Sequence, residues 1–144
     1  MKISTKGRYA LRTMIDIALN EHNGLVTLKH IWERQGITVK YLEQIATLLL
    51  RAGFLKSQRG NGGGYKLGMF PEKITVGSIL RAAEGSIAPI SCLEKTSNPC
   101  PRNIGCPTLP FWKNLHEVIN TYVDSVTLQD LVDNANKANN DFCI

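Results

Sequence analysis

The sequence lacks the features that would place this protein in a membrane or outside the cell. It has no run of about 18 apolar residues, which a membrane-spanning helix needs, and no charged-then-apolar start of the secretory type. We therefore expect a cytoplasmic protein with no membrane partner. Because thiols stay reduced in that compartment, its four cysteines favour metal or redox chemistry over structural disulfides.

Residues that would form an active site are also scarce. The three histidines are scattered at positions 22, 30 and 116, and no nucleophile, base and orienting group occur at a telling spacing. The glycine-rich stretch 59–64 lacks the Gly-Lys-Ser/Thr ending of a nucleotide-binding loop and is not followed by a helix. We expect neither enzymatic activity nor a nucleotide site.

Positive charge is present, and it is concentrated in the first half of the chain. Residues 1–68 hold eleven Lys and Arg against four Asp and Glu, whereas residues 69–144 hold six against eight. Contacts of Lys and Arg with phosphates release counterions and supply most of the nonspecific affinity for DNA. The asymmetry indicates a polyanion partner for the first half, with a solvated basic face as the alternative.

The spacing of apolar residues predicts three helices in this basic half, over residues 5–21, 28–36 and 38–52. Thr27 and Thr38 are suited to cap the second and third helices, which are joined by a tight turn around Gly36. Such a pair is a helix-turn-helix, whose second helix enters the DNA major groove. The polar residues at the start of that helix are the candidate DNA-binding residues: Thr38, Lys40, Glu43 and Gln44.

A β-hairpin, or wing, is predicted directly after the helix-turn-helix. Residues 54–58 and 65–67 are typical strands, and Asn61-Gly62 between them readily takes the positive φ angles of a tight turn. Arg59 at the tip is suited to a minor groove, whose negative potential attracts guanidinium groups. Arg59 and Asn61 complete the predicted DNA-binding set.

The second half of the chain contains three more predicted helices. Thr75 is suited to cap one that ends at Gly85, and a long one runs from Pro107 to about Asp124. The long helix carries two adjoining apolar stripes: Phe111, Leu115, Val118, Tyr122 and Trp112, Ile119, Val123, Val126. So broad an apolar face suggests contact with both the protein body and a twofold partner, the alternative being a helix buried in one core.

Beyond this long helix, Thr127 is suited to cap a last helix, and residues 134–144 are expected to form a frayed tail. Cys143 in that tail is taken as an incidental thiol.

Three cysteines lie close together between these helices, in the pattern Cys92-x7-Cys100-x5-Cys106. Neighbouring prolines restrict the backbone, which indicates a preshaped ligand loop. Structural zinc is disfavoured because it needs four ligands, usually with Cys-x2-Cys pairs. A direct thiol switch, with Lys95 and Arg102 favouring the thiolates, is the other alternative.

Several segments together resemble the winged-helix family of bacterial iron–sulfur regulators that includes IscR, NsrR and CymR. The resemblance covers nearly the whole chain. The segments that carry it are 3–10 (ISTKGRYA), 36–45 (GITVKYLEQI), 59–65 (RGNGGGY), 75–84, the three cysteines and 125–132 (SVTLQDLV).

The resemblance implies a mainly α fold with a small β-hairpin wing and a homodimer that regulates transcription at palindromic operators. Its parts would be a winged helix-turn-helix (1–84), a cluster-binding loop (85–106), a dimerisation helix with a C-terminal helix (107–133) and the tail (134–144). Cys92, Cys100 and Cys106 match the iron–sulfur ligands, and Glu43, Gln44 and Arg59 match DNA-contacting positions. The signal would be cluster supply, iron, oxidant or nitric oxide.

The fourth cluster ligand departs from the family pattern. Leu109 stands where IscR has a histidine, and Arg8 stands where NsrR has an acidic residue. His116, expected on the solvated side of its helix, Cys143, a small-molecule thiol or an exchangeable site are the remaining choices. Three thiolates and one labile site suit a [4Fe–4S] cluster slightly better than a [2Fe–2S] cluster. A constitutive regulator, or one controlled by a partner enzyme as CymR is, remains the alternative.

Overall fold

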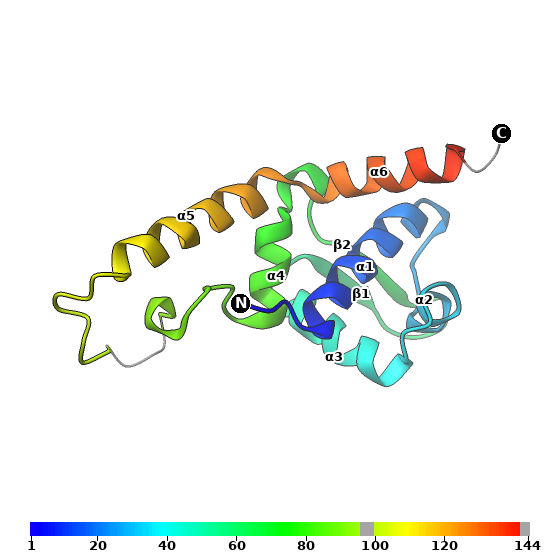
Figure 1. Cartoon of the computed structure of the whole chain (residues 1–144). Coiled ribbons are helices and arrows are strands. Elements are labelled where there is room, and N and C mark those ends of the chain that lie inside the picture. Colours follow the sequence, from blue (N-terminus) through cyan, green and yellow to red (C-terminus); the bar gives the residue numbers. More distant parts are fainter. Residues whose placement is uncertain (96–99, 142–144) are drawn as a thin grey trace.

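The computed structural model describes residues 1–95 and 100–141. These residues contain six α-helices and one β-hairpin (Figure 1). None of these described helices is long and apolar enough to cross a membrane. The predicted fold, mainly α with a β-hairpin wing, is confirmed. In chain order the elements are α1 (Thr5–Asn20), η1 (Glu21–Asn23), α2 (Leu28–Gln35), α3 (Val39–Arg51), β1 (Leu55–Gln58), β2 (Gly64–Leu67), η2 (Pro71–Lys73), α4 (Val76–Glu84), η3 (Ser91–Leu93), α5 (Leu109–Ser125) and α6 (Leu128–Asp141), where η denotes a short 3-10 helix.

Threonine side chains start four of the six helices. The hydroxyls of Thr27, Thr38 and Thr75 each accept the backbone N–H three residues later, at 3.2, 3.4 and 3.1 Å. Thr127 and Asp130 cap α6 reciprocally, since each side chain accepts the backbone N–H of the other, at 3.1 and 2.8 Å. Each cap satisfies a helix N–H that has no partner inside the helix, so these boundaries are set locally.

Helix α1 lies at the centre of the core. Its residues Ala10, Met14 and Ile17 are completely buried. Apolar side chains from most other elements pack around them: Ile31 of α2, Leu42, Ile45 and Leu49 of α3, Leu55 of β1, Ile79 and Ala83 of α4, and Leu128 and Val132 of α6. One core is therefore shared by the helix-turn-helix, the base of the wing, α4 and α6.

The wing is a two-stranded antiparallel hairpin in which Leu55 pairs with Leu67 and Gln58 with Gly64. The expectation of positive φ at Asn61 is wrong, because in the described chain only glycines take positive φ. Gly60 (φ 95°) and Gly62 (φ 73°) supply those angles instead, and the N–H of Gly63 donates to the carbonyl of Gly60 at 2.9 Å. Glycine has no Cβ to oppose this conformation, so the turn uses glycines on either side of Asn61.

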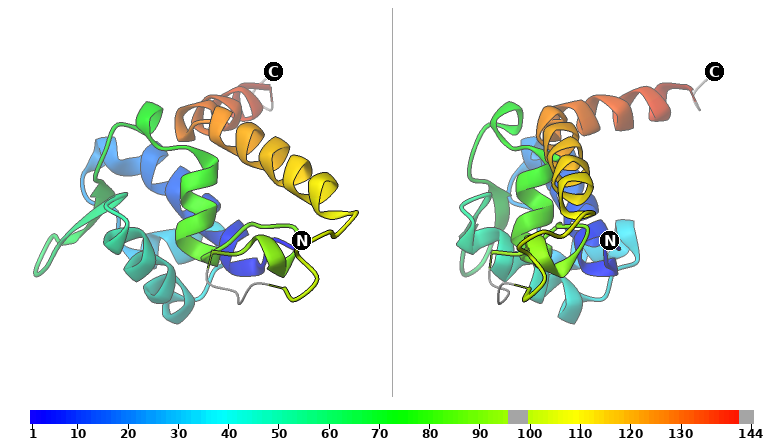
Figure 2. Two further views of the ribbon diagram at one scale, coloured as in Figure 1. Left: turned by 90° about the vertical axis from the view of Figure 1, so that its left-hand side faces the viewer. Right: turned by 60° about the vertical axis from the view of Figure 1, so that its left-hand side comes forward.

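Helix α5 and the segment before it project from the winged helix on one side (Figures 1 and 2). No α5 residue is fully buried, and Phe111, Val118 and Tyr122 are 61%, 65% and 69% exposed. The second predicted stripe, which includes Trp112, Ile119, Val123 and Val126, is half-buried. One stripe therefore contacts the protein body. The other is uncovered in the single chain except at Leu115, which is half-buried.

Helix α6 differs from its prediction. The expected frayed tail from position 134 is helical as far as Asp141. Leu128 and Val132 anchor the helix in the core, and Ala135 and Ala138 favour its propagation. Cys143 lies outside the described residues.

Candidate nucleic-acid interface and cysteine loop

The turn between α2 and α3 sets the direction of the predicted recognition helix. Gly36 adopts the left-handed conformation (φ 69°), and its N–H donates to the carbonyl of Trp32 at 2.8 Å. Ile37, only 2% exposed, then inserts into the core before Thr38 starts α3. A glycine at the left-handed position lets the chain leave α2 sharply without strain.

Helix α3 presents a polar face to solvent. All four predicted residues near its start, Thr38, Lys40, Glu43 and Gln44, are exposed, while Leu42 and its apolar neighbours are buried. Lys40, Glu43 and Gln44 lie on one side, because residues three and four apart are neighbours on a helix. Sequence reasoning missed Thr47, which extends this exposed face one turn further and whose hydroxyl donates to the carbonyl of Glu43 at 2.8 Å. Thr47 lies four residues after Glu43, and this spacing could have placed it on the same helix face.

Arg59 and Asn61 are exposed at the tip of the wing. The hairpin extends beyond the helical body in the left view of Figure 2. Its base is held by Val26, which exchanges backbone hydrogen bonds of 2.9 and 2.7 Å with Tyr65 of β2. The wing therefore has an anchored base and an exposed polar tip.

Side chains of α1 contact both helices of the helix-turn-helix. The carboxylate of Asp16, 2% exposed, accepts from the Arg34 guanidinium at 2.7 and 2.9 Å and from the Gln35 side chain at 3.0 Å. This carboxylate raises the pKa of Arg34 above its ordinary value, chiefly through the side-chain hydrogen bond. Tyr9 of α1 meets Tyr41 of α3 edge-on, with ring centroids 5.7 Å apart. In the sequence, the one indication that Asp16 is buried and paired is its place as an acidic residue among the apolar positions of α1.

The three loop cysteines are free thiols. Cys92 is exposed within η3, whereas Cys100 and Cys106 are half-buried. Across residues 1–95 and 100–141, no three His, Cys, Asp or Glu side chains come close enough to hold a metal ion. The loop therefore carries all three predicted thiol ligands, but in this conformation their sulfurs do not converge.

Cys106 lies in the turn before α5. Its Sγ is 3.4 Å from the hydroxyl of Thr108. This hydrogen bond, with help from the backbone N–H groups of Thr108 and Leu109, lowers the pKa of the Cys106 thiol despite some desolvation. The start of a helix favours negative charge, so Cys106 is disposed to be a thiolate, the form that binds metals or reacts.

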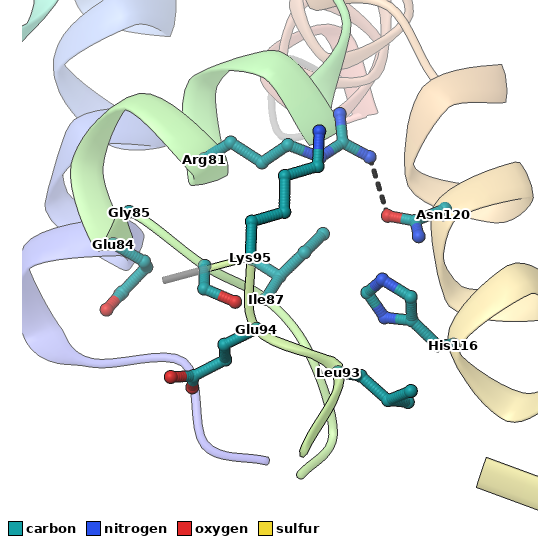
Figure 3. Close-up of a pocket in the computed structure, with 10 residues that line it drawn as sticks. Arg81, Glu84, Gly85, Ile87, Leu93, Glu94, Lys95, His116 and Asn120 are labelled. Carbon is teal, nitrogen blue, oxygen red and sulfur yellow. Dashed lines mark hydrogen bonds between the residues drawn. The ribbon is translucent and has the colours of Figure 1, made fainter. Parts of the chain in front are cut away.

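A cavity of about 570 Å³ lies between α4, α5 and the start of the cysteine loop (Figure 3). His116 of α5 faces it, so the expectation that this side chain points to solvent is wrong. Its Nδ1 atom is buried and has no hydrogen-bond partner within the described part of the chain. Leu93, Glu94 and Lys95, directly after Cys92, also line this cavity. Helix α5 packs on α4 here, so His116, which was expected on the polar side of α5, faces the space between the two helices.

Comparisons with known proteins agree with this geometry. A family model described as "Rrf2: Iron-dependent Transcriptional regulator" matches residues 3–134. The HTH-type transcriptional regulator IscR of Aliivibrio salmonicida is 42% identical over 135 residues, which cover 93% of this chain and 79% of that protein.

Two solved structures are also similar. One is an IscR from T. potens, with a TM-score of 0.76 and 38% identity, covering 96% of this chain and 90% of its own. The other is CymR, named as the global cysteine regulator of B. subtilis, with a TM-score of 0.73 and 39% identity, covering 92% of this chain and 97% of its own.

The helix-turn-helix with its wing, the family match and these relatives support one conclusion. The relatives are transcriptional regulators and not enzymes, which confirms the expectation drawn from the lack of an active site. This chain belongs to the Rrf2 family and is a DNA-binding transcriptional regulator of the winged-helix type.

Proposed function

We propose that this regulator is a cytoplasmic homodimer that binds a palindromic operator and responds to an iron–sulfur cluster on the cysteine loop. The observation that carries the proposal is the presence of three free thiols, Cys92, Cys100 and Cys106, on one accessible loop. The family's description as iron-dependent supports the same choice. The signal would be cluster supply, iron, an oxidant or nitric oxide.

DNA reading is assigned to the polar face of α3 and the tip of the wing. The amide of Gln44 is suited to the two hydrogen-bonding atoms of an adenine edge, and the carboxylate of Glu43 accepts from cytosine. Lys40 provides a phosphate contact, whereas Arg59 has the charge and reach for a minor groove. Thr38 and Asn61 add hydrogen bonds at the margins of this surface.

Dimerisation is assigned to the uncovered stripe of α5. Three large apolar side chains on one helix face, Phe111, Val118 and Tyr122, are each more than 60% exposed in the single chain. An exposed apolar face of this kind is typical of a protein interface. A twofold dimer through α5 would present two recognition helices to the two half-sites of a palindrome.

The donor set of the loop fits an iron–sulfur cluster. Cys92, Cys100 and Cys106 would hold it as thiolates, and the lowered pKa of Cys106 favours that form. When bound, the cluster would supply an iron centre whose labile position reacts with small molecules. Leu109 has no donor atom, so the fourth ligand is His116, Cys143, a small-molecule thiol or an exchangeable site. The exchangeable site suits [4Fe–4S] slightly better than [2Fe–2S]. Because the sulfurs are apart in this conformation, the loop must close to bind.

Purification without oxygen tests the proposal directly. The parent protein should be brown, with iron and sulfide on elemental analysis. Replacing Cys92, Cys100 or Cys106 with serine should remove the colour, and Cys143→Ser should leave it. Operator affinity should differ between loaded and cluster-free protein. A colourless parent, or one that contains zinc, would remove the cluster from the proposal.

One observation favours a second candidate, a direct thiol switch. The Thr108 hydroxyl lies 3.4 Å from the Cys106 sulfur and lowers the pKa of that thiol, which increases its share of thiolate, the form that reacts. Under this alternative, the colourless protein would change its operator affinity on oxidation, and Cys106→Ser would abolish the change. A constitutive or partner-controlled regulator would show neither response.

A further inference from the structure

Two lysines lie directly opposite each other on the wing. Lys56 of β1 pairs with Lys66 of β2 in the register of the hairpin, and both side chains are exposed. Neither ammonium group forms an ion pair with a side chain of residues 1–95 or 100–141. Like charges at directly opposed positions of two antiparallel strands destabilise the pairing. The hairpin therefore carries a repulsion that its own fold does not neutralise.

The lysine pair lies on the face of the hairpin that points away from the core. Successive residues of a strand point to opposite faces of the sheet. Leu55 belongs to the core, and Tyr65 and Leu67 pack against it, so these three side chains occupy the inner face. Lys56 and Lys66 alternate with them and occupy the outer face. The two strands contain no acidic residue, so neither supplies a carboxylate to that face.

Backbone contacts on both edges of β2 hold Lys66 in place. β1 pairs along one edge, and Val26 forms two backbone hydrogen bonds with the other, of 2.9 and 2.7 Å. A carboxylate oxygen of Glu21 accepts the N–H of Leu67 at 2.8 Å. Lysines on exposed edge strands prevent aggregation, which would account for Lys56 on β1. Because β2 has a neighbour on each edge, that role does not account for Lys66.

We propose that Lys56 and Lys66 form a phosphate-binding site on the wing, which contacts the DNA backbone beside the minor groove. A strand rises about 3.3 Å per residue, so Lys56 lies about 10 Å before Arg59 along the hairpin. With Arg59 at the minor groove, which is about 6 Å wide, this distance brings the lysine pair to the rim, where the phosphates lie. Phosphate bound there neutralises the charge that opposes strand pairing in the free protein. The inference rests on the proposed contact of the wing with DNA and not on the cysteine loop.

The salt dependence of DNA binding by Lys56→Gln and Lys66→Gln tests this site. Glutamine keeps a long polar side chain and removes the charge. Fluorescence anisotropy measures the affinity for a duplex obtained by binding-site selection and for an unrelated duplex of the same length. Each variant should lower the slope of log affinity against log salt by about 0.9 for each protomer bound. Over a tenfold range of salt this corresponds to a loss of about eightfold at the lower end, equal on both duplexes because phosphates carry no sequence information.

The same variants should gain stability while they lose affinity. Removing either lysine removes the repulsion, so the midpoint of urea denaturation should rise for each single variant at low salt and a fixed protein concentration. The double variant should gain no more than either single variant, because one substitution already removes the repulsion. Lysines that only support the fold would instead lose stability and affinity together.

Two further variants serve as controls. Lys137→Gln removes one exposed positive charge from α6, which lies on the opposite side of the molecule from α3 (Figures 1 and 2). It should leave the affinity and the salt slope as they are in the parent. Arg59→Ala reports whether the tip of the wing contacts DNA, independently of the lysine pair.

Three results would overturn the inference: a salt slope of the lysine variants equal to that of Lys137→Gln, a loss of stability together with affinity, or a loss confined to the selected duplex. If Arg59→Ala weakens binding and the lysine variants do not, only the phosphate site fails. If none of the wing variants weakens binding, the assignment of the wing to DNA contact fails as well.

Discussion

The ion pair between Asp16 and Arg34 offers a measurable link between the fold and DNA reading. Arg34→Met keeps the length of the side chain and removes three close nitrogen–oxygen contacts of 2.7, 2.9 and 3.2 Å. It leaves the carboxylate of Asp16, 2% exposed, with the Gln35 amide at 3.0 Å as its remaining side-chain donor in the described structure. The variant therefore leaves the buried Asp16 carboxylate without its positively charged partner.

The expected cost follows from that burial. Breaking a fully buried pair destabilises a protein by about 3–5 kcal/mol, because the remaining charge has lost its partner. The Arg34 side chain is 37% exposed, so water reaches one side of the pair and lessens the cost. We expect a loss of about 2–3 kcal/mol in the free energy of unfolding, a large share of the total for a domain of this size.

Urea denaturation at one fixed protein concentration measures this loss, since a dimer's apparent stability depends on concentration. Operator affinity should also fall, because α2 is held on α1 by this pair. The double variant Asp16→Leu, Arg34→Met removes the stranded charge and should recover most of the stability. A cost below about 0.5 kcal/mol for Arg34→Met, the range of a surface substitution, would refute the reasoning.

Three further predictions concern function. Gln44→Ala should cost about 1–3 kcal/mol at one operator base pair, and Glu43→Ala should broaden the sites bound; equal losses on unrelated sequences in a binding-site selection would contradict both assignments. Val118→Lys should place a charge in the dimer interface and yield folded monomers in sedimentation, whereas an unchanged dimer would remove α5 as the interface. Thr108→Val should raise the pKa of Cys106 towards its ordinary value, so the rate of alkylation by iodoacetamide should fall off at a higher pH than in the parent; an identical pH–rate profile would show that Thr108 does not stabilise the thiolate.

Local signals in the sequence were sufficient for the element boundaries of the winged helix. Thr27 and Thr38 predict helix starts because a threonine hydroxyl can accept a hydrogen bond from a first-turn N–H that has no partner inside the helix. Gly36 predicts the tight turn because glycine adopts positive φ angles without strain. The paired apolar stripes of α5 predict two contacting faces, since helical periodicity determines which residues share a side. One of these faces packs on the protein body, and the partner for the other stays a prediction.

Other local inferences failed because a neighbouring residue or element changed the outcome. Asn61 was expected to take positive φ, but Gly60 and Gly62 flank it and adopt that conformation at less cost. Residues 134–141 were expected to fray, but the buried Leu128 and Val132 hold the start of that helix against α1 and allow it to continue.

The helix caps, the wing, the exposed polar face of α3 and the spacing of the three cysteines can be predicted from the sequence, because each depends on residues a few positions apart. The partners of buried or half-buried polar groups cannot, because they depend on how the helices pack. Glu84 bonds to residues 77 and 80 positions away, and Asp16 bonds to Arg34 on another helix. His116 faces a cavity because α4 and the cysteine loop lie opposite it. Such pairings depend on how the helices pack, and no local repeat in the chain records that arrangement.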